Sequence, residues 1–180
     1  MFQYNRLKER LLYRLKFKCI IKAISETIVE HILVRGEASM SIFQIVYVFC
    51  LAIQLGFYFS FSNTIMPVLG KQAGNVGQRI MQDINKQVEN DQFLGSFFAP
   101  IFLFIAILLL GNPIDWQMYL SFVIYFAGVI GVTIAFNMPL NRQLANRKTR
   151  TDWAEFVQQW SRWNHVRTGS ALVALALAIS

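Results

Sequence analysis

The feature that most limits the fold of this sequence is the grouping of its apolar residues into long runs without a charge. Three such runs are Ser41–Ser62, Phe93–Gly111 and Trp116–Phe136. Each has about 20 residues, the number that a helix needs to cross a hydrocarbon core about 30 Å thick. Only 15% of the residues are charged, whereas soluble domains have about 25%. The sequence therefore predicts three membrane-spanning helices.

A fourth apolar run, Thr168–Ser180, is too short to span a bilayer by itself at 1.5 Å per residue. It can span only if its helix begins upstream, within Trp153–Arg167. On that condition we predict that residues 40–180 form an all-α integral membrane four-helix bundle.

Between the first two spans, Ala73–Asn90 has the pattern of an amphipathic helix at the membrane interface. Its apolar positions recur every four residues, at Val76, Ile80, Ile84 and Val88. Small residues recur at the same spacing in the spans and predict contact between the first and third spans. These residues are Ala52, Gly56 and Ser60 in the first span, and Ala127, Gly131 and Ala135 in the third.

The first 39 residues differ from the rest, because they hold eight Lys or Arg and four Glu. If the chain started at Met40, the stretches after spans one and three would hold nine Lys or Arg and the stretch between spans two and three none. The positive-inside rule would then place loops one and three in the cytoplasm of a bacterial inner membrane. With residues 1–39 included, this bias disappears. We hypothesise that residues 1–39 are a mis-assigned start or a dispensable arm; a genuine cytosolic arm is the alternative.

Polar residues follow both odd-numbered spans in the same pattern. Asn63 precedes Met66-Pro67, and Asn137 precedes Met138-Pro139. Asparagine caps helices and proline ends them, so we expect turns where the chain leaves the bilayer.

The segment Trp153–Thr168 concentrates polar and aromatic residues directly before the last apolar run. On a helix, Trp163, Asn164 and Arg167 fall near one face, and His165 points to its flank. A charge at membrane depth is costly, so Arg167 should face protein, water or headgroups. We expect partners on the same side of the membrane, namely Asn63, Asn137 and Asn141. Interfacial anchoring by Trp and Arg is the alternative reading.

The order and spacing of three motifs resemble the anthrone-oxygenase-like membrane family over residues 40–180. They are Met66-Pro67-Val-Leu69-Gly70, Asn137-Met-Pro139-Leu140-Asn141 and Trp160-Ser-Arg-Trp163-Asn164-His165-Val-Arg167-Thr168. Met138 departs from the valine that is more usual there. The resemblance implies a four-span helical protein. Its fungal members imply oxidation of polycyclic phenolic anthrones by dioxygen, without a metal or flavin motif.

The residues are compatible with such chemistry. His165 could accept a proton and Arg167 could stabilise an oxyanion, which makes them the candidate catalytic residues. The candidate ligand-binding residues are Asn63, Asn137, Asn141, Trp163 and Asn164. The sequence has no metal-ligand cluster and no dinucleotide-binding loop, so we expect no metal and no cofactor.

We therefore predict a membrane protein with a polar site for a hydrophobic or aromatic small molecule at the cytoplasmic face. The family resemblance implies that it acts as a cofactor-independent oxygenase. The alternative is a non-enzymatic bundle, such as a transporter subunit or an assembly protein. The expected partners are membrane lipid and a hydrophobic ligand. Nucleic acid is not expected, because membrane topology accounts for the basic residues. The sequence leaves the oligomeric state open.

Overall fold

The computed structural model describes residues 40–111, 114–146 and 152–180. These residues are helical and contain no strand, which confirms the predicted all-α class for this part of the chain. The hypothesis about residues 1–39 concerns a segment outside the described residues.

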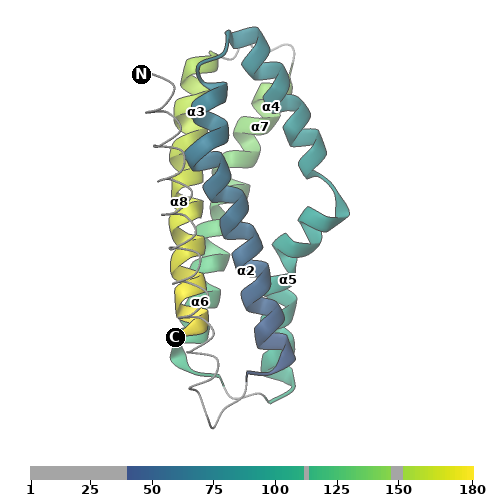
Figure 1. Ribbon diagram of the computed structural model, residues 1–180. Coiled ribbons are helices and arrows are strands. Elements are labelled where there is room, and N and C mark those ends of the chain that lie inside the picture. Colours follow the sequence, from purple (N-terminus) through teal and green to yellow (C-terminus); the bar gives the residue numbers. More distant parts are fainter. Residues whose placement is uncertain (1–39, 112–113, 147–151) are drawn as a thin grey trace, which may run out of the picture. The chain divides into compact units, whose positions relative to one another are not determined.

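Three continuous helices are long and apolar enough to cross a membrane: Ile42–Leu69, Asp91–Leu109 and Trp116–Ala145. The first consists of α2 (Ile42–Ser60), a π-helical turn (Phe61–Ile65) and α3 (Met66–Leu69). The second is α5 (Asp91–Leu109), which runs beside α2 (Figure 1). The third consists of α6 (Trp116–Tyr125), the π-helical segments Phe126–Gly131 and Thr133–Asn137, and α7 (Met138–Ala145).

The last helix, α8 (Trp153–Ile179), begins upstream of the final apolar run, as the sequence predicts. Asp152 caps it by accepting a hydrogen bond from the Ala154 N–H. Its 27 residues extend about 40 Å at 1.5 Å per residue. It is not one of the three helices that are both long and apolar enough to cross a membrane. The fourth span therefore stays a prediction.

The predicted Asn-Pro turns are wrong, because Pro67 and Pro139 lie within continuous helices. Proline lacks an N–H and clashes with the carbonyl four residues earlier. A wider π-helical turn precedes each proline: the Met66 N–H donates to the Phe61 carbonyl, and the Met138 N–H donates to that of Thr133. Each donor is thus bonded five residues back, a register in which the chain continues through the proline.

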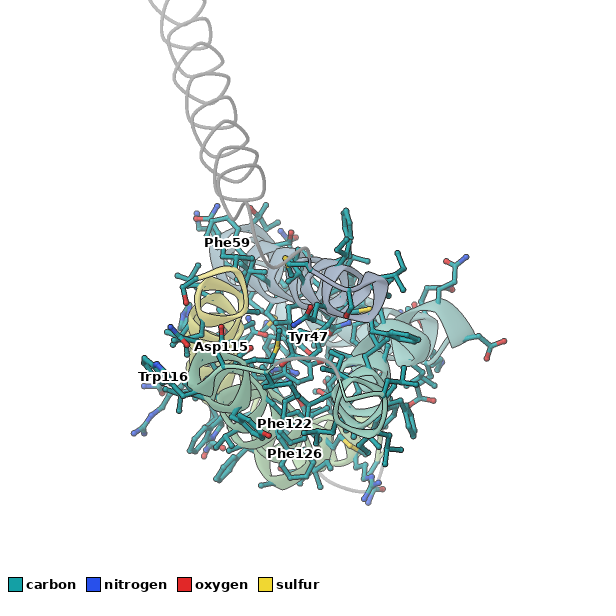
Figure 2. The ribbon with its side chains drawn as sticks, turned by 90° about the horizontal axis from the view of Figure 1, so that it is seen from below. Tyr47, Phe59, Asp115, Trp116, Phe122 and Phe126 are labelled. Carbon is teal, nitrogen blue, oxygen red and sulfur yellow. The ribbon has the colours of Figure 1, made fainter. Side chains whose placement is uncertain are left out.

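The buried side chains form two apolar cores along the bundle. The spanning core lies among α2, α5, α6 and α8 and includes Tyr47, Phe104, Val129 and Ala174. Seen from below, Tyr47 points between the helices, whereas Phe59 and Trp116 lie at the periphery (Figure 2). The head core, near the N-terminal half of α8, consists of Phe61, Met66, Leu69, Met81, Leu144, Phe156 and Trp160.

The predicted amphipathic helix is present as α4 (Gly74–Val88). It lies beside α7, where Gln82 Nε2 donates to the Leu144 carbonyl at 2.7 Å (Figure 1). Its buried side carries Met81, whereas Val76 and Ile80 are 43% and 41% exposed. The expected stripe is therefore turned outward at its first two positions. A side chain at Gly77 would overlap the Trp153 ring, so the absence of one lets Trp153 pack on that side of α4.

The predicted small-residue contacts are also wrong. Ala52, Gly56 and Ser60 are all exposed on α2. The close approach occurs instead at Gly128, where an added Cβ would overlap the Ser170 side chain of α8. A missing side chain on one helix thus admits a short side chain from the other, the packing that small residues permit in membrane helices.

Candidate functional site

A layer of polar side chains lies where the spanning core and the head core meet, and it includes Tyr58 of the former and Trp160 of the latter. We call it the polar layer; its members are Tyr58, Ser62, Thr133, Asn137, Asn141, Trp160, Asn164, Arg167 and Thr168. Twenty residues separate Ile42 from Ser62, which at 1.5 Å per residue is about 30 Å, the thickness of the hydrocarbon core. The polar layer therefore lies one hydrocarbon thickness from the far end of α2.

Arg167 is the charged centre of this layer and is only 5% exposed. Its Nη1 donates to Thr133 Oγ1 at 3.3 Å and its Nη2 to Asn164 Oδ1 at 2.8 Å. The guanidinium carbon lies 4.6 Å from the Tyr58 ring centroid and 5.1 Å from that of Trp160. Within the described residues Arg167 forms no ion pair, and its Nε has no hydrogen-bond partner.

Asn164 holds Arg167 in place and is fully buried. Its Nδ2 donates to the Tyr58 carbonyl at 2.9 Å and to Ser62 Oγ at 2.7 Å. Its Oδ1 accepts from Arg167. The Ser62 hydroxyl also bonds the Thr168 hydroxyl at 2.9 Å. Asn164 therefore ties α8 to the first span and also bonds Arg167.

Asn137 and Asn141 attach the third span to α8 through Trp160. The Asn137 amide donates to the Trp160 carbonyl at 3.3 Å, and Trp160 Nε1 donates to Asn141 Oδ1 at 2.9 Å. Asn137 is 1% exposed, and its Oδ1 has no partner. The Tyr58 hydroxyl, which faces Thr133, also lacks a well-formed hydrogen bond. Buried polar groups are nearly always bonded, so these atoms and Arg167 Nε retain hydrogen-bonding capacity that the described residues do not use.

The structure brings together Asn137, Asn141, Asn164 and Arg167, but not the remaining residues that the sequence analysis proposed. Asn63 is exposed, and its amide reaches only the neighbouring Thr64 hydroxyl at 3.5 Å. His165 is exposed on the opposite side of α8 from Arg167. Trp163 is half-buried and stacks on Phe136 with ring centroids 3.5 Å apart.

Sequence reasoning missed Tyr58, Ser62 and Thr133 as members of the polar layer. A signal was present, since Gln54, Tyr58 and Ser62 follow one another at intervals of four residues along an otherwise apolar span. This spacing puts them on one face of a helix. Gln54 is fully buried one turn farther into the bilayer, with its Nε2 donating to Ser96 Oγ at 2.9 Å.

The donor set of the polar layer suits an anion rather than a metal ion. It offers a guanidinium, amides and hydroxyls, whereas metal ions select carboxylate, imidazole or thiolate ligands. Across residues 40–111, 114–146 and 152–180, no group of three or more His, Cys, Asp or Glu could hold a metal. A buried cation without a counter-ion attracts an oxyanion, because its burial is costly until it is paired.

These observations define the class of protein: an all-helical integral membrane protein with three apolar helices of spanning length and a buried arginine at one end of the spanning core. A family model described as Anthrone oxygenase matches residues 89–177. The resemblance predicted from the sequence is confirmed over these residues, which are similar to the anthrone oxygenase family. The match covers Asn137, Asn141, Asn164 and Arg167, whereas Tyr58 and Ser62 precede it. No curated protein and no solved structure matches the chain.

Proposed function

We propose that the polar layer binds a largely apolar small molecule through one acidic oxygen, such as that of a phenolate or enolate. The observation that carries this proposal is the buried Arg167, which has no counter-ion among the described residues and an unbonded Nε. Two nitrogens of the guanidinium already serve Thr133 and Asn164. The free Nε offers one more hydrogen bond, and a charge-assisted bond of this kind is the stronger sort.

The rings around Arg167 support an aromatic rather than an aliphatic ligand. Tyr58 and Trp160 both lie against the guanidinium, and Phe61 packs on Trp160 with ring centroids 5.3 Å apart. Aromatic rings pair favourably with other flat rings. Asn137 Oδ1, which has no partner, would accept a hydrogen bond from a second polar group of the ligand.

The proposed reaction follows from the family to which residues 89–177 belong. An ionised phenol is electron-rich and can pass electrons to dioxygen. For anthrone this oxidation consumes one O₂ and yields anthraquinone and one water. Arg167 would favour the ionised form of the bound substrate by stabilising its oxyanion. His165 lies on the other side of α8, so in this proposal the phenolic proton passes to solvent rather than to His165.

In the same proposal the head core faces the cytoplasm of a bacterial inner membrane. The support is the excess of Lys and Arg after the first and third spans, which is typical of cytoplasmic segments and holds on the hypothesis that the chain starts at Met40. A non-enzymatic role is the alternative, in which Arg167 serves only to hold α8 against the first and third spans. The bonds from Arg167 to Thr133 and from Asn164 to Tyr58 and Ser62 are the observation behind it.

The test compares anthrone, whose enol form is a phenol, with anthracene, which has the same rings and no oxygen. We expect purified protein in detergent to retain anthrone over anthracene in equilibrium dialysis. We expect Arg167→Gln to lower anthrone retention about tenfold or more and to leave anthracene unchanged, because a hydrogen bond to a charged group contributes about 1.5–3 kcal/mol. Equal retention of both compounds by the wild type would refute the binding proposal.

Oxygen consumption separates the enzyme from the non-enzymatic alternative. With anthrone bound, an oxygenase consumes one O₂ for each anthraquinone formed, faster than empty micelles and dependent on Arg167. Binding without faster oxidation would leave a ligand-binding protein and exclude the reaction. Heating followed by size-exclusion chromatography checks that Arg167→Gln is still folded.

A further inference from the structure

The outward face of α8, opposite the polar layer, carries an ordered series of side chains along one stripe. From the head toward the far end it presents Arg162, His165, Gly169, Leu172 and Val173, all of them exposed, with the exposed Val166 beside them on the same side. Steps of three and four residues keep these positions on one side of a helix. The stripe therefore changes from cationic and polar to open and then to aliphatic.

The polarity of this stripe follows the order of groups in a phospholipid. Arg162 precedes Arg167 by five residues, or about 7.5 Å along the helix at 1.5 Å per residue. The polar layer marks one edge of the hydrocarbon core, and the headgroup region adds about 5–7 Å on each side. Arg162 and His165 thus lie at headgroup depth, while Leu172 and Val173 lie at the depth of acyl chains.

The arginine at the head of the stripe is restrained and unneutralised. Its guanidinium carbon is 5.8 Å from the Trp163 ring centroid, and that ring stacks on Phe136 at an angle of 7°. Arg162 forms no ion pair in the described parts of the chain. Glu155, two turns earlier on the same side of α8, accepts a hydrogen bond from Gln159. The fixed aromatic pair limits the freedom of Arg162, so less entropy is lost when it binds an anion.

Gly169 supplies the space that a lipid backbone requires. Apart from the residue itself, its chain neighbours and the adjacent backbone of α8, no atom lies within 4 Å of the position that its Cβ would occupy. A missing side chain between His165 and Leu172 leaves a notch on the helix surface, where a glycerol group can approach the backbone. The exposed Leu172 and Val173, at 56% and 47%, continue this surface into the region that faces lipid.

We propose that the stripe Arg162–His165–Gly169–Leu172–Val173 is a docking site for one anionic phospholipid. Arg162 and His165 donate hydrogen bonds to its phosphate, its glycerol lies over Gly169, and an acyl chain follows Leu172 and Val173. The argument rests on charge complementarity and on the continuity of the stripe with the lipid-facing surface. It is independent of the ligand proposed for the polar layer, which lies on the other side of α8.

The test uses purified full-length protein in detergent, incubated with equal amounts of phosphatidylglycerol and phosphatidylcholine. Lipids retained through size-exclusion chromatography are counted by mass spectrometry. We expect the wild type to retain phosphatidylglycerol over phosphatidylcholine, and Arg162→Gln to lower that ratio about fivefold. Adding His165→Gln should lower it further, and Gly169→Leu should reduce the retention of both lipids.

The matched control is Arg142→Gln, which removes an exposed cation from α7 instead. It should leave the ratio unchanged. A wild type that retains both lipids equally would overturn the proposal. So would an equal loss in Arg142→Gln, because general positive charge would then explain the preference. All four residues are exposed, so these changes should not disturb folding.

Discussion

Two arginines on α8, only five residues apart, occupy opposite environments. Arg167 is 5% exposed and lies between the rings of Tyr58 and Trp160, whereas Arg162 is exposed and lies over the outer ring of Trp163. Five residues turn a helix by about 140° from the starting direction, which moves a side chain from the inner to the outer face. The same residue type thus serves an interior polar layer in one case and the membrane surface in the other.

The comparison shows what burial does to a charge in this protein. The inner face provides a hydroxyl partner from the Thr133–Asn137 segment, an amide partner from α8, and no carboxylate among the described residues. The outer face provides Arg162 with the ring of Trp163 and leaves its side chain exposed. A buried cation depends on its partners for stability, whereas an exposed one is screened. Changes on the inner face should therefore cost stability or binding, and matched changes on the outer face should not.

The largest contrast is expected between the neighbours Asn164 and His165. Asn164→Ala removes bonds to Tyr58, Ser62 and Arg167. Without the bond from Asn164, the buried charge of Arg167 is less well paired. We therefore expect the free energy of unfolding to fall by about 3 kcal/mol or more. His165→Ala, on the outer face, should change stability by less than about 0.5 kcal/mol.

Both variants can be compared by heating in detergent and measuring the folded fraction by size-exclusion chromatography. Equal loss of the folded peak in the two variants would contradict the division of α8 into a structural inner face and a tolerant outer face.

An intermediate contrast is expected between Gly128, which faces α8 from the third span, and Gly169, which belongs to α8. A Cβ at Gly128 overlaps Ser170 on the inner face of α8, whereas one at Gly169 meets nothing within 4 Å. Gly128→Ala should therefore destabilise by about 1–3 kcal/mol, the usual cost of overpacking. Gly169→Ala should be neutral or slightly stabilising, because alanine favours a helix over glycine by about 1 kcal/mol.

The same thermal assay measures both glycine variants. The double variant Gly128→Ala with Ser170→Gly is the internal control, because it removes the overlapping side chain. Failure of this double variant to recover stability would show that the contact with Ser170 does not explain the loss.

The smallest effect is expected from a charge placed beside Arg167. Thr133 Oγ1 accepts from Arg167 Nη1 at 3.3 Å, so Thr133→Asp supplies an internal counter-ion at this position. We expect the fold to persist and anthrone retention to fall by about five- to tenfold, because Arg167 is then already paired. Equilibrium dialysis measures the loss.

Thr133→Val is the matched control, since it removes the hydroxyl and adds no charge. It should retain more anthrone than Thr133→Asp. If the aspartate variant bound anthrone as well as the wild type, an anion at Arg167 would no longer account for binding.

Helix position along the chain was predictable because it follows from local pattern. The uncharged runs, the amphipathic segment before α5 and the upstream start of α8 all appear in the sequence and in the structure. The turns expected at Pro67 and Pro139 were predicted wrongly, since proline usually ends a helix. The π-helical turns that carry the chain through them depend on hydrogen bonds in a register that residue type alone does not specify.

The candidate site was predictable in part. Asn164 and Arg167 share a helix face by spacing, and Asn137 and Asn141 meet them through Trp160. Asn63 and His165 carry suitable chemistry but point away. Thr133 was missed, because a threonine in an apolar span has no polar signal until a charged partner lies beside it. Tyr58 was missed although its four-residue spacing from Gln54 and Ser62 was visible in the sequence.

The sequence by itself determined that this chain forms apolar helices of spanning length, and it placed a costly charge at the start of the last apolar run. Those properties follow from hydrophobicity and helical period, which are local. Only the tertiary structure decided which side of each helix is buried, and that the third span packs closely on α8 at Gly128 rather than on the first span at the Ala52–Ser60 stripe. It also decided that Arg167 meets an amide and a hydroxyl instead of a carboxylate. Lipid is as apolar as the helix interiors, so hydrophobicity does not select the buried face, and close packing and hydrogen bonds do.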